Sequence, residues 1–140
     1  MRIGFDAKRA FLNSTGLGNY SRDSIRLLSH FYADNKYFLY TPKEIKNSRL
    51  AFLKNRDNTF IRTPQSLLNN TLKSYWRSKS IVSDLFTNKI DIYHGLSHEL
   101  PLGIEKTSIK TVVTIHDLIF IRYPHLFKLI DRKIYNKKFK

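Results

Sequence analysis

The fold of this chain is decided by two stretches near its beginning, Arg2-Ile3-Gly4-Phe5 and Thr15-Gly16-Leu17-Gly18-Asn19-Tyr20. The first is mostly apolar and too short for a helix, so it predicts a strand. From the second stretch onward, mostly apolar side chains recur at helical spacing through residue 31. This series is Leu17, Tyr20, Ser24, Leu27, Leu28 and Phe31. The beginning of the chain therefore predicts a strand, a glycine loop and a helix.

The glycine loop is a candidate ligand site. Gly16 and Gly18 allow the backbone to approach a ligand closely and to adopt positive φ. The first N–H groups of the following helix have no partner within the helix and carry partial positive charge. We therefore expect a phosphate or a sugar hydroxyl at Gly16, Leu17, Gly18, Asn19 and Tyr20. The alternative is an ordinary strand-to-helix turn that needs glycine for its geometry alone.

Two well-known nucleotide motifs do not fit this loop. Ser21 occupies the place of the third glycine in the Gly-x-Gly-x-x-Gly pattern, which disfavours a nucleotide-sugar epimerase or dehydrogenase. No Gly-Lys-Ser/Thr sequence ends the loop, which excludes the P-loop.

The composition predicts one globular domain. The chain has 140 residues, of which 41% are hydrophobic and 14% aromatic, enough to form a core. It has no cysteine, so neither disulfides nor thiolate metal sites are available. No apolar run approaches the length of a membrane span, and Met1 leads directly into the first strand. We therefore expect a cytoplasmic protein.

The chain is strongly basic, with a formal charge of +14 from 25 Lys and Arg against 11 Asp and Glu. Such an excess attracts nucleic acid, acidic lipid headgroups or phosphorylated small molecules. No RRM, KH or zinc-finger pattern is present, so nucleic acid is not the expected partner. The densest basic patch, from Lys128 to Lys140, ends without a helix-stopping residue. We therefore expect the chain to be a fragment that ends within a helix.

Further strands and a helix follow along the chain. Apolar runs bounded by turn residues predict strands at residues 37–41, 59–62, 91–95 and 110–117. Residues 68–86 have helical periodicity, and Ser66 can cap that helix. The last strand carries β-branched residues on both faces, which predicts an interior strand covered by helices. The alternation indicates an α/β, Rossmann-like, doubly wound and mostly parallel sheet.

In such sheets, ligands bind at the carboxyl ends of the strands. This rule brings together the Gly16–Tyr20 loop, the His94–Glu99 loop and the pair His116-Asp117. The His116 imidazole can exchange hydrogen bonds with a sugar hydroxyl, and the Asp117 carboxylate can orient it or accept a proton. Alternatively, Asp117 caps the turn that begins at Leu118 while His116 is buried and hydrogen-bonded.

A metal site is not expected in the His94–Glu99 loop. The spacing of His94 and His98 would require a helix for both imidazoles to reach one ion, but Gly95 and Pro101 indicate a loop. Either this polar loop contacts a ligand, or it is a plain loop.

Several segments together resemble the amino-terminal half of bacterial family-four glycosyltransferases, which are retaining enzymes of the GT-B fold and include many mannosyl- and glucosyltransferases. The segments, in order, are Met1-Arg2-Ile3-Gly4-Phe5-Asp6-Ala7, Thr15-Gly16-Leu17-Gly18-Asn19-Tyr20-Ser21-Arg22, Asp91-Ile92-Tyr93-His94-Gly95-Leu96-Ser97-His98-Glu99-Leu100-Pro101, Thr114-Ile115-His116-Asp117-Leu118, Arg122-Tyr123-Pro124 and Asp131-Arg132-Lys133-Ile134-Tyr135.

The resemblance implies one half of a two-domain GT-B enzyme. Its amino-terminal Rossmann-like domain, residues 1–140 here, mainly holds the acceptor, and its carboxyl-terminal domain holds the nucleotide-sugar. The histidine that matches His116 lies beside the transferred sugar. The resemblance implies no metal, because basic side chains and helix termini neutralise the departing diphosphate. The second domain, with its phosphate-binding basic residues and paired glutamates, is missing from these 140 residues, so we expect this chain alone to be inactive.

On these grounds we expect the acceptor-side domain of a hexosyltransferase in cell-envelope polysaccharide synthesis. It would transfer a hexose, with retention, from a nucleotide-sugar donor to a saccharide or lipid-linked saccharide. The expected catalytic residues are His116 and Asp117, and the expected substrate contacts are Gly16, Leu17, Gly18, Asn19, Tyr20, His94 and Ser97. Outer basic residues would hold the enzyme against anionic lipid on the inner membrane face. The alternative is a non-catalytic basic Rossmann-like module that binds nucleic acid or serves protein assembly, and the oligomeric state is left open.

Overall fold

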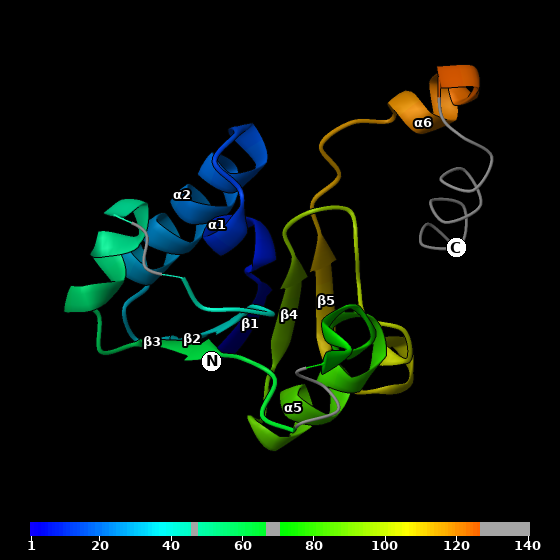
Figure 1. Ribbon diagram of the computed structural model, residues 1–140. Coiled ribbons are helices and arrows are strands. Elements are labelled where there is room, and N and C mark those ends of the chain that lie inside the picture. Colours follow the sequence, from blue (N-terminus) through cyan, green and yellow to red (C-terminus); the bar gives the residue numbers. More distant parts are fainter. Residues whose placement is uncertain (46–47, 67–70, 127–140) are drawn as a thin grey trace.

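Five parallel strands form the sheet of the computed structural model, in the order β3-β2-β1-β4-β5 (Figure 1). Their bounds are β1 (Arg2–Asp6), β2 (Lys36–Tyr40), β3 (Thr59–Arg62), β4 (Ile92–Gly95) and β5 (Lys110–Val113). The structure describes residues 1–45, 48–66 and 71–126. The sheet and its helices confirm the predicted α/β, Rossmann-like fold.

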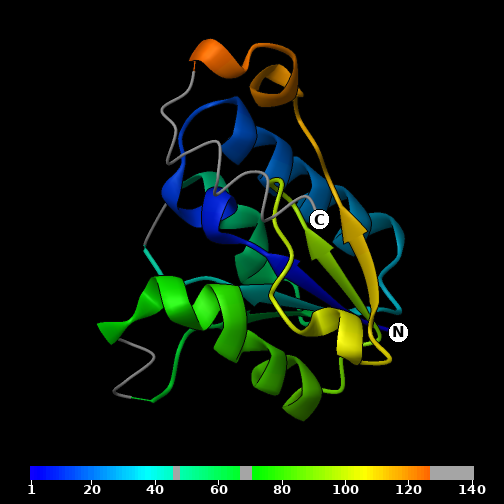
Figure 2. The same cartoon turned by 90° about the vertical axis from the view of Figure 1, so that its right-hand side faces the viewer.

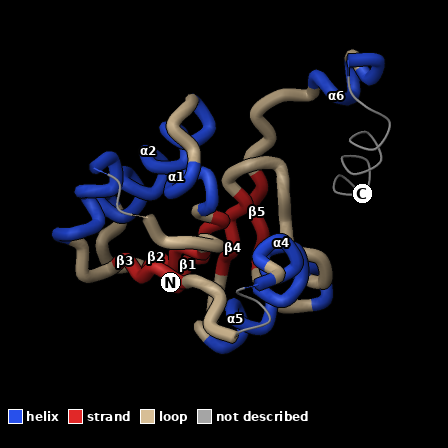
Figure 3. The backbone as a smooth tube through the Cα atoms, in the orientation of Figure 1, coloured by secondary structure: helices blue, strands red, loops and turns tan. Residues whose placement is uncertain are grey.

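Helical segments lie on both faces of the sheet (Figures 2 and 3). One face carries α1 (Lys8–Leu12), α2 (Gly16–Phe31) and the 3-10 helix η1 (Ser48–Asn55). The other carries α4 (Lys73–Tyr75), the π-helix η2 (Trp76–Ser80), α5 (Ile81–Thr87) and the 3-10 helix η3 (Ile104–Lys106). The short α6 (Ile119–Arg122) and η4 (Pro124–Leu126) stand away from the sheet in both ribbon views. The predicted basic patch at 128–140 lies outside the described residues.

The side-chain alternation of β2 divides the core into two clusters. Tyr37 and Leu39 pack with α1, α2 and η1 on one face, whereas Phe38 and Tyr40 pack with Trp76 and α5 on the other. The four β2 side chains from Tyr37 to Tyr40 are buried, because β2 lies between two neighbouring strands and under helices on both faces. The sheet is therefore doubly covered at its centre.

The buried face of α2 differs from the predicted one. Its buried residues are Gly18, Ser21, Arg22, Ile25 and Ser29. On the predicted face, Tyr20, Leu27 and Phe31 are exposed, and Phe31 retains 70% of its accessible surface. The other three residues of that face are only partly buried. Small residues at positions 18 and 21 permit close packing against the chain before α2, and that packing outweighs the hydrophobic periodicity.

The second predicted helix is shifted by the π-helix. Trp76 and Ile81 are both fully buried although they are five positions apart, because the Ile81 N–H donates to the Trp76 carbonyl and widens this turn. The predicted face positions Tyr75 and Phe86 are consequently exposed. Helical residues from 73 to 87 confirm most of the prediction, and its expected start at 67–70 lies outside the described residues.

The prediction that residues 110–117 form a covered interior strand is wrong. β5 is an edge strand in the described sheet, it ends at Val113, and all four of its residues are exposed. β-branched residues fit any extended strand, so they do not distinguish an edge strand from a central one.

Within the part of the chain that the structure describes, no helix has the length and apolar character to cross a bilayer.

Candidate functional site

Three elements meet at the carboxyl edge of the sheet through one threonine. The Thr114 hydroxyl, just beyond β5, lies 2.8 Å from Nε2 of His94 on β4 and 3.1 Å from the Tyr20 hydroxyl on α2. A hydroxyl donates one hydrogen bond and accepts up to two, so Thr114 can serve both neighbours at once. Tyr20 and His94, far apart in the sequence, are thereby held in one network.

Two further histidines complete this group. The His116 ring stacks edge to face against Tyr20, with centroids 4.9 Å apart, and lies 5.2 Å from the His98 ring. We call Tyr20, His94, His98, Thr114 and His116 the rim cluster. It confirms that the fold brings the three predicted segments to one edge of the sheet.

Hydrogen bonds fix the proton positions on two rings of the rim cluster. Nε2 of His116 lies 2.9 Å from the Leu96 carbonyl, which can only accept, so Nε2 carries the proton. In the neutral ring, Nδ1 is then an acceptor. The backbone N–H of His116 donates to Nε2 of His98 over 3.4 Å, so that nitrogen is unprotonated.

Burial holds part of the rim cluster uncharged. It lowers the pKa of His94 below the ordinary value of 6.5. Burial, with a smaller contribution from the neighbouring His116, also lowers the pKa of His98. At neutral pH these two imidazoles are therefore neutral hydrogen-bonding groups rather than cations.

The glycine loop differs from its prediction, because Gly16 and Gly18 already belong to the first turn of α2. Neither has positive φ; the described glycine that does is Gly103. The Asn13 side chain accepts hydrogen bonds from the N–H groups of Thr15 and Gly18 and so caps the helix. One N–H group expected to meet a ligand is thus already used.

Gly18 is required by packing. A Cβ atom at this position would lie 2.0 Å from the Asn13 carbonyl oxygen, whereas Gly16 has open space around it. Gly16 and Leu17 remain at the helix start, near the carboxyl edge of the sheet. Asn19 points elsewhere, because its side-chain oxygen accepts a hydrogen bond from Arg22.

The remaining predicted residues flank the rim cluster. Oδ1 of Asp117 accepts a hydrogen bond from the Ile119 N–H over 3.2 Å, the capping role considered above as the alternative. Ser97 is buried between Leu96 and His98, next to the carbonyl that binds His116. His116 is partly buried rather than fully enclosed.

A charged group beside the rim cluster was not predicted as a site. Arg77 lies 3.0 Å from the buried Asp6 carboxylate and 2.7 Å from that of Glu99. Burial opposes its charge, but the two carboxylates together raise the pKa of Arg77. Asp6 is the last residue of β1, so the rule that ligands bind at the carboxyl ends of strands would have identified it. Arg77 lies within a stretch of helical periodicity, which gives no such signal.

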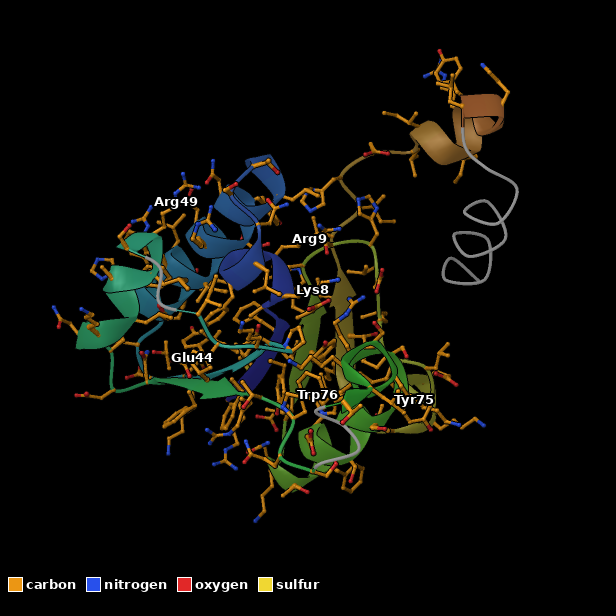
Figure 4. All side chains as sticks on the ribbon, viewed as in Figure 1. Lys8, Arg9, Glu44, Arg49, Tyr75 and Trp76 are labelled. Atoms are coloured by element: carbon orange, nitrogen blue, oxygen red, sulfur yellow. The ribbon has the colours of Figure 1, made fainter. Side chains whose placement is uncertain are left out.

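Lys8 lies at the same edge of the sheet (Figure 4). Burial lowers the pKa of its ammonium, and repulsion by Arg77 and Arg9 lowers it further. In the described ranges, no group of three or more His, Cys, Asp or Glu side chains is arranged to hold a metal ion.

Comparison of the chain with protein-family models, with curated proteins and with solved structures found no match.

Proposed function

We propose that this chain is the acceptor-side domain of a retaining hexosyltransferase, with the rim cluster facing the sugar. The observation that carries the proposal is the meeting of Tyr20, His94 and His116 at the carboxyl edge of a parallel sheet. This edge is where doubly wound domains bind their ligands. The order of the sequence motifs along the chain supports the same assignment.

The chemistry of the rim cluster suits a neutral polyol. Hydroxyl and neutral imidazole groups exchange hydrogen bonds with sugar hydroxyls without needing a counter-charge. Nδ1 of His116 would accept a hydrogen bond from a hydroxyl of the transferred hexose. The second carboxylate oxygen of Asp117, beside it, would orient the acceptor.

In the proposed reaction, the bond between the anomeric carbon and the donor diphosphate breaks. The acceptor oxygen then bonds to that carbon, and the acceptor proton leaves with the diphosphate. His116 acts by holding the hexose in position, so its loss should lower turnover by about 100-fold, the order of magnitude expected for lost positioning.

The test is sugar transfer by the protein in its natural full length. Labelled GDP-mannose, UDP-glucose and UDP-N-acetylglucosamine are offered with a cell-envelope extract to the wild type, His116→Ala and the control His125→Ala, which alters a histidine in η4. Transfer from one donor that is lost only in His116→Ala supports the proposal. The absence of transfer and of donor hydrolysis with all three would favour a binding module instead.

A further inference from the structure

A cavity of about 290 Å³ lies along α2 and faces η1 rather than the rim cluster. Its lining is mainly charged and consists of Asn19, Arg22, Asp23, Arg26, Arg49 and Phe52. Figure 4 shows Arg49 beside α2, apart from Lys8 and Arg9 near β4. We call this cavity the arginine pocket.

Arg22 gives the arginine pocket a buried positive charge. Its residue is 5% exposed, and its guanidinium donates to the carbonyls of Ala10 and Asn13 at 2.9 and 2.8 Å and to the side-chain oxygen of Asn19 at 2.6 Å. All three acceptors are neutral. Among the described residues, no carboxylate forms an ion pair with Arg22.

The buried charge of Arg22 has neutral hydrogen-bond partners and is offset only in part by the nearby Asp23 carboxylate, so an anion in the cavity would stabilise it further. Burial and then repulsion from Arg49 lower the pKa of Arg22, and attraction by Asp23 opposes them only in part, which agrees with two guanidiniums lying near each other. The folded structure therefore brings the positive charges of Arg22 and Arg49 close together in the arginine pocket, in addition to the overall basic charge of the chain.

The other charged groups of the arginine pocket leave its net charge positive. Arg26 lies 3.2 Å from Asp23 in an exposed ion pair, which contributes little stability and rearranges readily. Arg49 donates to the Ser14 carbonyl at 2.9 Å, which fixes its guanidinium near the pocket. Three guanidiniums and one carboxylate leave two formal positive charges in the lining.

We propose that the arginine pocket binds the phosphate group of a phosphorylated ligand, at a site separate from the rim cluster. The planar guanidinium presents paired N–H donors that match two phosphate oxygens, and two positive charges match a phosphate dianion. Phe52 supplies an apolar wall for the carbon part of such a ligand. The phosphate belongs either to a soluble compound or to a lipid headgroup.

The first experiment titrates the protein with inorganic pyrophosphate in an isothermal calorimeter. The variants are Arg26→Gln, Arg49→Gln and their combination, because Arg22 holds three oxygens of the fold and its loss would disrupt the chain around α2. The matched control is Lys79→Gln, which removes one charge from the exposed surface of η2. Thermal unfolding by circular dichroism establishes that every variant is folded.

The second experiment measures co-sedimentation with phosphatidylcholine vesicles, with and without phosphatidic acid. If pyrophosphate binding weakens about tenfold or more in the double variant and less than about twofold in Lys79→Gln, the source is a soluble phosphate. If only binding to phosphatidic acid shows this pattern, the source is a lipid headgroup. The proposal is overturned if neither probe binds, or if Lys79→Gln weakens binding as much as the double variant.

Discussion

The Tyr20 ring on α2 meets the His116 imidazole beyond β5 edge to face, with a centroid distance of 4.9 Å and an angle of 89°. Such pairs contribute about 0.5–1.5 kcal/mol beyond the area that they bury. This contact ties α2 to the segment that follows β5. It leaves two polar aromatic groups facing the same edge of the sheet.

The Thr114 hydroxyl links Tyr20 to His94, so we expect Thr114→Val to lower the free energy of unfolding by about 1–2 kcal/mol. Valine keeps the shape of threonine but removes the shared hydroxyl. The control is Thr111→Val on exposed β5, where the change should stay within about 0.5 kcal/mol. Urea unfolding measures both variants, and equal losses would contradict the network.

The two glycines of α2 should respond in opposite ways to alanine. Gly18→Ala places a Cβ atom against the Asn13 carbonyl, so we expect a loss of about 3 kcal/mol or failure to fold. Gly16→Ala meets no atom within 4 Å and should stabilise the helix by up to about 1 kcal/mol. Thermal unfolding of the pair checks this, and a stable Gly18→Ala protein would refute the packing role.

The buried ion pair of Asp6 and Arg77 predicts a large effect. Asp6→Ala leaves Arg77 with Glu99 alone and should lower the free energy of unfolding by about 3 kcal/mol. Asp23→Ala removes an exposed pair and should cost less than about 1 kcal/mol. A similar, small loss in both variants would mean that Asp6 is well solvated.

The lowered pKa values of His94 and His98 predict a dependence of stability on pH. In the unfolded chain these imidazoles take up protons near pH 6.5, whereas in the folded protein they do so only at lower pH. The free energy of unfolding should therefore be highest above about pH 7 and should fall as the pH drops through 6.5.

Urea unfolding at several pH values measures this slope, and His94→Gln should make it shallower because one of the two groups is removed. A stability that is constant or rises between about pH 7 and 5.5 would contradict the assignment.

The strands were predictable because each is a short apolar run between turn residues, and Thr59–Arg62 agrees with its predicted bounds. The helix faces were less predictable. The buried face of α2 is made by Gly18, Ser21 and Arg22, whose burial depends on the backbone of Asn13 rather than on hydrophobicity. The π-helix at Trp76 likewise shifts the register by one residue, and spacing alone does not reveal it.

The rim cluster was predictable in part. The rule for carboxyl ends of parallel strands identified the loops of Tyr20, His94 and His116. It could not identify Thr114 as the residue that links Tyr20 and His94. That role depends on how the Thr114 hydroxyl lies relative to side chains on α2 and β4. Nor does the sequence show that Asn19 and Tyr20, neighbours in the chain, have different partners, Asn19 with Arg22 and Tyr20 with Thr114.

The most direct test of the proposed sugar site at the rim cluster is an NMR titration of the histidine rings with methyl α-mannopyranoside and methyl α-glucopyranoside. The chain has five histidines, of which three belong to the rim cluster, while His30 and His125 lie elsewhere and serve as internal controls. We expect saturable shifts of the His94, His98 and His116 ring signals and constant signals from the other two. No shift in any ring, or equal shifts in all five, would contradict a sugar site at the rim.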